Sequence, residues 1–236
     1  MTLLETSNLT VGYDGIPVLR DVSLTVDEAS VVALVGRNGV GKTTLLKGIM
    51  GINDVLSGRI EFGGADITDL PPHETAARGI GYIPQTRDIF GRLSVEDNIR
   101  LGTVTADGAG LSDSLPDGLY DDFPVLKGKA TAKGESLSGG QQQLLAIARA
   151  VVSDPELLLL DEPTEGIQPS IVSEVGDIIT RTKQETGAAY LVVEQNIDFV
   201  STVADYCFVM QKGQIVAEGP TEEVLDDDVI ADNLLV

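Results

Sequence analysis

Tryptophan is absent from this sequence of 236 residues, which also holds a single cysteine and a single histidine. Cys207 lies in an apolar stretch beside Phe208, so we expect a buried, unreactive thiol and no disulfide. His73 follows two prolines in an expected surface turn. Catalysis through histidine or cysteine is therefore not expected.

Long apolar runs are also missing, since none approaches the roughly 20 residues that cross a bilayer. The N-terminus, residues 1–5, lacks the basic start of a signal peptide. We therefore expect a soluble, intracellular protein. A chain of 236 residues with 42% hydrophobic content is long enough for one large domain with a substantial core.

Basic residues are scarce: 16 Lys and Arg face 37 Asp and Glu, which gives a net charge of -21. This charge disfavours nucleic acid and anionic lipid as direct partners. The acidic residues are spread from Asp21 to the run 226–228 rather than gathered in one tail. A proteome adapted to high intracellular salt explains them better than an acidic binding face, because concentrated cations screen self-repulsion.

A phosphate-binding pattern, GxxxxGK[ST], stands between an apolar run at 31–35 and an expected helix that begins near Thr43 and ends near Gly48 or Gly51. Its glycines let backbone N–H groups converge on phosphate oxygens at the positive end of the helix. We expect Lys42 to reach the β and γ phosphates and Thr43 to ligate magnesium. The predicted nucleotide-binding residues here are Gly36, Arg37, Asn38, Gly39, Val40, Gly41, Lys42, Thr43 and Thr44.

Two acids follow a second apolar run, Leu157 to Leu160. In an α/β sheet, ligands bind at the carboxyl ends of such strands. We expect Asp161 to hold magnesium, the only metal anticipated here, and Glu162 to act as general base for an attacking water.

A third motif, 137–141, reads LSGGQ and opens an amphipathic helix whose apolar positions follow helical spacing. Ser138 and Gln141 have capping-box spacing, and Gly139 and Gly140 keep side chains away from the helix N-terminus. Such an N-terminus binds anions.

Together these motifs resemble the ATP-binding subunits of ABC transporters, over essentially the whole chain. The resemblance implies that paired chains hold ATP between the phosphate loop of one and the LSGGQ segment of the other. It implies that Tyr13 stacks on adenine, and that Gln85 senses magnesium and the attacking water. From the residues alone, Tyr13 could be a turn residue and Gln85 an ordinary polar loop residue.

Two positions depart from the pattern of this family. Gln195 stands where most members have histidine, and Gln168 stands where the segment after the catalytic glutamate usually ends in aspartate. Glutamine donates and accepts hydrogen bonds but carries no proton at neutral pH. Our hypothesis is that Glu162 remains the base and Gln195 acts by positioning.

The expected fold is α/β, of the phosphate-loop ATPase type. Residues 22–27 alternate and predict an antiparallel sheet near the N-terminus, whereas strands and helices alternate from Val31 onward and predict a mostly parallel core sheet. We expect one ATP-binding domain, 1–236, with a RecA-like core and its antiparallel part at about 1–85 and 154–236. A helical part at about 86–153 carries LSGGQ, a mobile loop lies at 103–118, and a short helix begins near Thr221.

The residue identities in four segments resemble those of the smaller ATPase subunit of importers for branched-chain amino acids and urea. The segments are 36–47, 123–126, 162–170 and 193–195. Arg37, Val40, the pair 198–199 and the ending 233–236 lean toward the urea members. The resemblance implies two membrane-spanning permease subunits, a second and different ATP-binding subunit, and an external substrate-binding protein. It places the chain on the cytoplasmic side of the membrane as a peripheral subunit. The alternatives are a soluble ABC ATPase acting on ribosomes or DNA, and a nucleotide switch without hydrolysis.

The acidic composition generates a first prediction. The melting temperature should rise steeply with KCl into the molar range, because cations screen the repulsion within a chain of net charge -21. Thermal unfolding followed over a KCl series measures this. A flat dependence would contradict adaptation to high salt.

Overall fold

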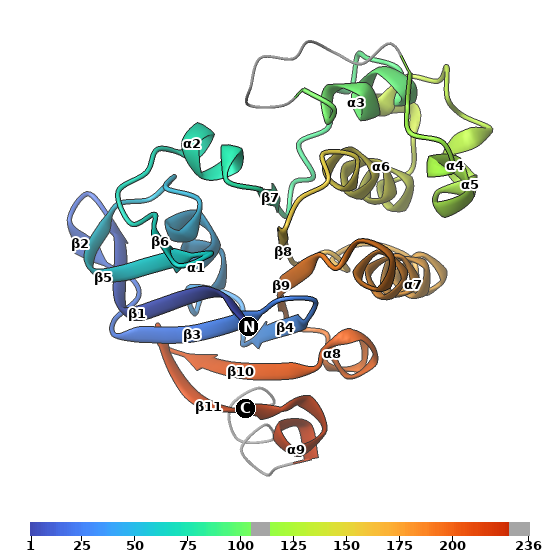
Figure 1. The fold of residues 1–236 in the computed structure, drawn as a ribbon. Helices are drawn as coiled ribbons and strands as arrows, with labels where there is room; N and C mark the ends of the chain where they lie inside the picture. Colours follow the sequence, from blue (N-terminus) through green and yellow to red (C-terminus); the bar gives the residue numbers. More distant parts are fainter. Residues whose placement is uncertain (105–113, 227–236) are drawn as a thin grey trace.

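The computed structural model describes residues 1–104 and 114–226. Figure 1 shows an antiparallel sheet built mainly from the N-terminal part, a second sheet through the centre, and a group of helices beyond its β7 edge. Most of the loop expected at 103–118, the end of the acidic run at 226–228 and the ending 233–236 lie outside the described residues.

The first sheet is antiparallel and has the order β2-β1-β5-β6, with β3 also paired to β1. In β3, Val22, Leu24 and Val26 are buried and the residues between them are exposed, as the alternation predicted. Its strands are β1 (Thr2–Tyr13), β2 (Ile16–Pro17), β3 (Val22–Asp27), β5 (Val55–Phe62) and β6 (Ala65–Asp66).

Strands β5 and β6 depart from the alternation of strands and helices expected after Val31. They return to the first sheet because β5 pairs with β1, with Leu4 opposite Phe62. Gly63 and Gly64, at φ 55° and 75°, form the tight reversal between β5 and β6. The sheet is thus completed by a segment that follows the phosphate loop in sequence.

The central sheet has the order β11-β10-β4-β9-β8-β7. Its first five strands in sequence run parallel, and β11 forms an antiparallel hairpin with β10. This confirms the mostly parallel core. The strands are β4 (Val31–Val35), β7 (Ile80–Ile83), β8 (Leu157–Asp161), β9 (Ala189–Glu194), β10 (Tyr206–Gln211) and β11 (Gln214–Pro220).

Both faces of this sheet are covered, so β4, β8 and β9 are buried along their whole length. On β4, Val32 and Leu34 pack in one core cluster with α1, whereas Ala33 and Val35 pack in another with α8 and α9. Such double burial explains the continuous apolar runs in the sequence. The helices around the sheet are α1 (Lys42–Ile49), α2 (Pro72–Ala77), α7 (Pro169–Thr186), α8 (Ile197–Val203) and α9 (Thr221–Asp226).

The segment between β7 and β8 is helical in its described parts and lies beyond the β7 edge in Figure 1. In α6, Leu144, Ile147 and Ala148 are buried, on the face that the periodicity predicted. The segment contains α3 (Val95–Leu101), α4 (Leu119–Asp122), α5 (Pro124–Lys127), the 3-10 helix η1 (Gly134–Ser136) and α6 (Gly139–Val151).

His73 lies in α2 and Cys207 in β10. His73 is highly exposed, which confirms the expected surface position, but it lies in the first turn of α2, so the expected turn conformation is wrong. Pro72 suits the first position of a helix. Cys207 is buried in β10, and burial raises the pKa of its thiol to about 12. Within the described ranges, no helix combines the length and apolar character that a bilayer span requires.

Candidate active site

The phosphate loop leaves β4 at Gly36 and ends at Gly41, the residue before α1. A Cβ on Gly36 would lie 2.6 Å from the Met210 carbonyl oxygen, and Gly39 and Gly41 have φ of 81° and 114°. Only glycine meets these conditions without strain. The helix begins at Lys42, one residue before the predicted start, and a pocket of about 130 Å³ is lined by Val18, Gly39, Gly41, Lys42, Thr43, Thr44 and Glu162.

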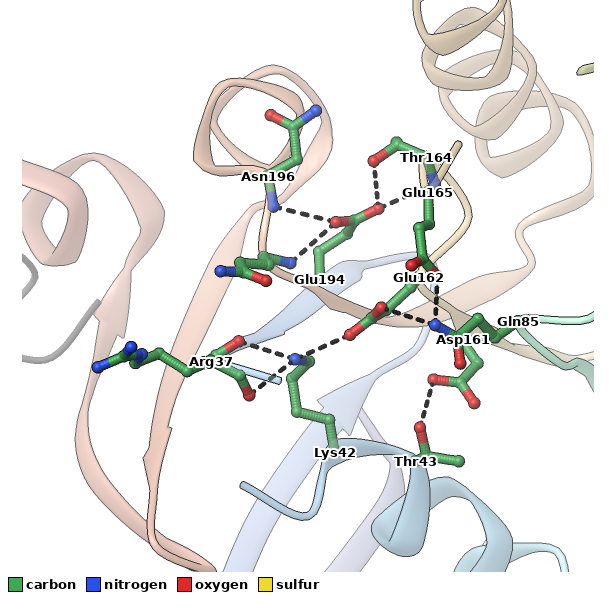
Figure 2. Close-up of polar contacts among 12 residues, drawn as sticks. Arg37, Lys42, Thr43, Gln85, Asp161, Glu162, Thr164, Glu165, Glu194 and Asn196 are labelled. Carbon is green, nitrogen blue, oxygen red and sulfur yellow. Dashed lines mark hydrogen bonds and ion pairs between the residues drawn. The ribbon is translucent and has the colours of Figure 1, made fainter. Parts of the chain in front are cut away.

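Lys42 joins this loop to the carboxyl end of β8, as Figure 2 shows. Its ammonium lies 2.9 Å from Glu162 Oε1 and donates to the carbonyl oxygens of Gly36, at 2.7 Å, and Arg37, at 3.2 Å. The side chains of Lys42 and Glu162 are only 3% and 11% exposed, so this pairing is little weakened by water. Three acceptors match the three N–H donors of the lysine.

Asp161 lies beside the first turn of α1. Its carboxylate accepts a hydrogen bond from Thr43 Oγ1 at 2.9 Å and another from the Tyr82 hydroxyl at 3.2 Å. Burial raises the pKa of Asp161, and the neighbouring charge of Glu162 raises it further, against the hydrogen bonds that lower it. Burial also raises the pKa of Tyr82, so its hydroxyl stays a donor. Carboxylate and hydroxyl oxygens so close together are the ligands that Mg²⁺ prefers, so the donor set fits this ion.

Gln85 follows β7 and reaches the same group of side chains (Figure 2). Its amide donates to Glu162 Oε2 at 3.1 Å and to the carboxylate of Glu165. The structure thus brings Gln85, Lys42 and Glu162 together, although they are distant in sequence. Sequence alone allowed Gln85 to be an ordinary loop residue.

Tyr13 is the last residue of β1 and lies beside α1. It is 46% exposed, and its hydroxyl lies 3.5 Å from Thr44 Oγ1. That hydrogen bond is the largest of the influences that lower the pKa of Tyr13. Tyr13 is therefore anchored to α1 while its ring remains accessible.

Ser138 and Gln141 form the predicted capping box at the start of α6. Ser138 Oγ accepts from the Gln141 N–H at 3.4 Å, and Gln141 Oε1 accepts from the Ser138 N–H at 3.2 Å. In Figure 1, α6 and α1 lie on opposite sides of β7 and β8. Among the described residues, no hydrogen bond or ion pair joins 138–141 to the phosphate loop.

Arg87 is a connecting residue that our sequence analysis missed. Its guanidinium donates to Gln143 Oε1 in α6 and to the Glu165 carbonyl oxygen, both at 3.1 Å. Its terminal nitrogen lies beside Gly139, 3.4 Å from where a Cβ would be. Arg87 thus ties the Gln85 loop to the LSGGQ helix, and no motif in the sequence marks it.

The two glutamines that depart from the family pattern lie at the carboxyl end of β9 and the start of α7. Gln195 follows β9 and lines a cavity of about 400 Å³, whose other lining residues are Asn38, Glu162, Thr164, Glu165, Glu194 and Asn196. Gln168 is the exposed residue before α7 and makes no side-chain cap. Like Arg87, Glu194 was given no role in the sequence analysis. The signal that could have identified it is a carboxylate at the end of an apolar strand.

The environment of Asp161 generates a second prediction. Because the pKa of Asp161 is raised in the folded state, its protonated form favours folding. The contribution of Asp161 to the free energy of unfolding therefore falls as the pH rises through that pKa. Asp161→Asn removes the buried charge and keeps an acceptor for Thr43. Without nucleotide, the melting temperature at neutral pH should rise by about 2–4 °C, the shift that roughly 1 kcal/mol produces at this chain length.

The same variant should lose the extra stabilisation that ATP is expected to give with Mg²⁺, because the expected metal site would lose a charged ligand. Thermal scans with and without MgATP measure both effects. The matched control is Asp66→Asn at an exposed carboxylate whose pKa is lowered by the Thr68 hydroxyl, and this change should not raise the melting temperature. A melting temperature of Asp161→Asn below that of the wild type would contradict the prediction.

Comparison with known proteins agrees with this geometry. The family model described as ABC transporter matches residues 19–165. The chain is 36% identical over 226 residues to the probable branched-chain amino acid transport ATP-binding protein LivF of Archaeoglobus fulgidus, covering 96% of this chain and 95% of that protein. It is also 36% identical over 230 residues to the lipopolysaccharide export system ATP-binding protein LptB of Escherichia coli K12, covering 97% of this chain and 95% of that protein.

The fold has solved counterparts. The ADP conformation of MJ1267, an ATP-binding cassette of an ABC transporter, matches with a TM-score of 0.84 and 29% identity, covering 98% of each chain. Sequence and structure thus agree on the family as well as on the phosphate-loop fold. This chain belongs to the ATP-binding subunits of ABC transporters and is an ATPase.

Proposed function

We propose that this chain binds ATP and Mg²⁺ and energises an importer of urea or branched-chain amino acids. The observation that carries the proposal is the hydrogen-bonded group of Lys42, Glu162 and Gln85, beside the Thr43–Asp161 pair. It combines a cation for phosphate, oxygen ligands for a metal ion and a carboxylate for water. The similarity to the probable branched-chain amino acid transport ATP-binding protein of Archaeoglobus fulgidus supports the amino-acid alternative.

In this proposal each residue has a separate task. Backbone N–H groups of the phosphate loop and the Lys42 ammonium bind the triphosphate. Thr43 and Asp161 would hold Mg²⁺, which would neutralise charge on the phosphate oxygens, and Gln85, hydrogen-bonded to Glu162, would sense the metal and the attacking water. Glu162 takes the proton of the attacking water, and Tyr13 offers its accessible ring to adenine.

Gln195 acts by position in this proposal. It lines the same cavity as Glu162 and can donate a hydrogen bond to a phosphate oxygen without titrating. Gln168, exposed before α7, supplies an amide for contact across the dimer. Glutamine at these two positions, where the family usually has histidine and aspartate, retains hydrogen bonding and removes charge.

The proposed ATP site is shared between two chains. Ser138, Gly139, Gly140 and Gln141 lie apart from the phosphate loop of their own chain, which supports their action on ATP held by a paired subunit. We infer that the paired chain is a second, different ATP-binding subunit. In this arrangement 1–236 acts as one domain, in which the helical part at about 86–153 presents LSGGQ to the partner.

The membrane attachment that we propose is indirect. Two membrane-spanning permease subunits would dock between the Gln85 loop and the helical part, on the cytoplasmic side, with an external substrate-binding protein delivering the cargo. Three large apolar side chains in the segment between β7 and β8 are exposed: Phe90 at 52%, Leu93 at 37% and Val104 at 50%. Such exposure is typical of a protein interface, and the net charge of -21 disfavours direct binding to anionic lipid or nucleic acid.

The role of the catalytic carboxylate generates a third prediction. In the complex assembled with its partner subunits, Glu162→Gln should reduce phosphate release by at least about a hundredfold, because the amide cannot accept a proton from water. Gln195→Ala should cause a smaller loss, since Gln195 only positions groups. Release of phosphate under single-turnover conditions measures both. Undiminished hydrolysis in Glu162→Gln together with its loss in Gln195→Ala would reverse these roles.

The cargo generates a fourth prediction. A strain that lacks this chain should lose uptake of labelled urea at low concentration, and the wild-type chain should restore it while Glu162→Gln should not. Uptake of labelled leucine, measured in parallel, is the control for cargo. Loss of leucine uptake instead would assign the chain to the amino-acid branch, and loss of neither would favour a non-transport ATPase or a switch without hydrolysis.

A further inference from the structure

Glu194 is a buried carboxylate that the proposed mechanism does not use. It ends β9 and is 3% exposed. Among residues 1–104 and 114–226, no ion pair involves it, so hydrogen-bond donors balance its charge. A buried charge held in this way has to be explained, because leaving it without partners is costly.

The donors come from two separate segments, as Figure 2 shows. Glu194 Oε1 accepts from the Thr164 N–H at 3.0 Å and from the Thr164 hydroxyl at 2.6 Å. Glu194 Oε2 accepts from the N–H groups of Gln195, at 2.9 Å, and Asn196, at 3.0 Å. One oxygen therefore holds the segment after Glu162, and the other holds the segment that carries Gln195.

The backbone at Glu162 needs such support. Its φ is 47°, in the left-handed region that residues with a side chain rarely adopt. Its N–H donates to the Val193 carbonyl oxygen at 2.9 Å, and Thr164, two residues later, is held by Glu194. Glu162 is thus held to the end of β9 by its own N–H and, two residues later, by Thr164.

We propose that Glu194 is a positioning residue for ATP hydrolysis, holding the Glu162 and Gln195 segments in one register around the shared cavity. All three residues line that cavity of about 400 Å³. A carboxylate is required because both of its oxygens accept. A glutamine of the same shape has one accepting oxygen, so in either orientation of the amide at least one backbone N–H loses its acceptor: that of Thr164, or those of Gln195 and Asn196. The inference rests on the proposed role of Glu162 as base.

The test measures phosphate release and nucleotide binding in the assembled complex. Glu194→Gln should lower kcat at least about tenfold, because displacing a reacting group by a fraction of an ångström has effects of this size or larger. The KM for ATP and the Kd for a fluorescent ATP analogue should change less than about twofold. Among the described residues, the Glu194 side chain makes no hydrogen bond to Lys42 or the phosphate loop, and the Gly36 N–H donates to the Glu194 backbone carbonyl oxygen, at 3.4 Å, which the substitution keeps.

Thr164 supplies the variants that separate positioning from general stability. Thr164→Val removes the hydroxyl and should lower kcat severalfold, Thr164→Ser should restore it, and Thr164→Val with Glu194→Gln should resemble Glu194→Gln alone. The control is Thr75→Val, at a fully buried threonine in α2, which should reduce the melting temperature without changing kcat. Should Glu194→Gln fail to fold, the Thr164 series still decides.

Three results would overturn the inference: a kcat within twofold of wild type in Glu194→Gln, a parallel rise in KM, or an equal loss of kcat in Thr75→Val. Glu162→Gln, measured alongside, separates this inference from the proposed function. Hydrolysis that persists in Glu162→Gln would refute the role of Glu162 itself. Hydrolysis lost in Glu162→Gln but unchanged in Glu194→Gln and Thr164→Val would refute the role of Glu194 alone.

Discussion

Parallel pairing of β4, β9 and β8 is the constraint on which the active site depends. Val35 lies opposite Glu194, and Asp161 lies opposite Val193, so the three strands end at the same edge of the sheet. At this edge the phosphate loop follows β4, Glu162 follows β8 and Gln195 follows β9. Burial of the sheet on both faces keeps these ends in register, because sliding one strand would expose its apolar residues on either face.

At that edge the Lys42 ammonium lies among several carboxylates in a partly water-free space, and the charges of Lys42, Glu162, Asp161 and Glu194 are matched locally. Lys42 pairs with Glu162, whereas Asp161 relies on two hydroxyl donors and Glu194 on four donors from two segments. These three arrangements differ in the role that each carboxylate can take. A carboxylate whose pKa is raised by burial, such as Asp161, gains most from a metal ion, while one that is fully hydrogen-bonded, such as Glu194, serves better as a support.

The Gln85 loop is one of the connections between the helical part and this edge. Arg87 reaches α6, and Arg149 of α6 reaches back to the carbonyl oxygens of Arg87 and Asp88 and lies 5.4 Å from the centre of the Phe90 ring. Gln85 itself contacts Glu162. A displacement at the exposed Phe90 therefore has a short path of direct contacts to Glu162 and to the start of the LSGGQ helix.

The sequence by itself determined the features that depend on neighbouring residues. The glycines of the phosphate loop, the capping box of Ser138 and Gln141, and the doubly buried strands are local patterns of backbone freedom, hydrogen bonding and hydrophobicity, and the structure confirms each of them. The motif spacing also indicated the family. The assignments of individual site residues stay predictions.

Only the tertiary structure decided the rest, because these features join residues that are far apart along the chain. Three examples are the pairing of β5 with β1, the hydrogen bond from Arg87 to α6 and the hydrogen bond from Thr164 to Glu194. In each, no local pattern specifies the partner. A hydrogen bond across 56 residues, as in the Arg87–Gln143 pair, leaves no periodicity in the sequence, since only the packed fold brings donor and acceptor within reach.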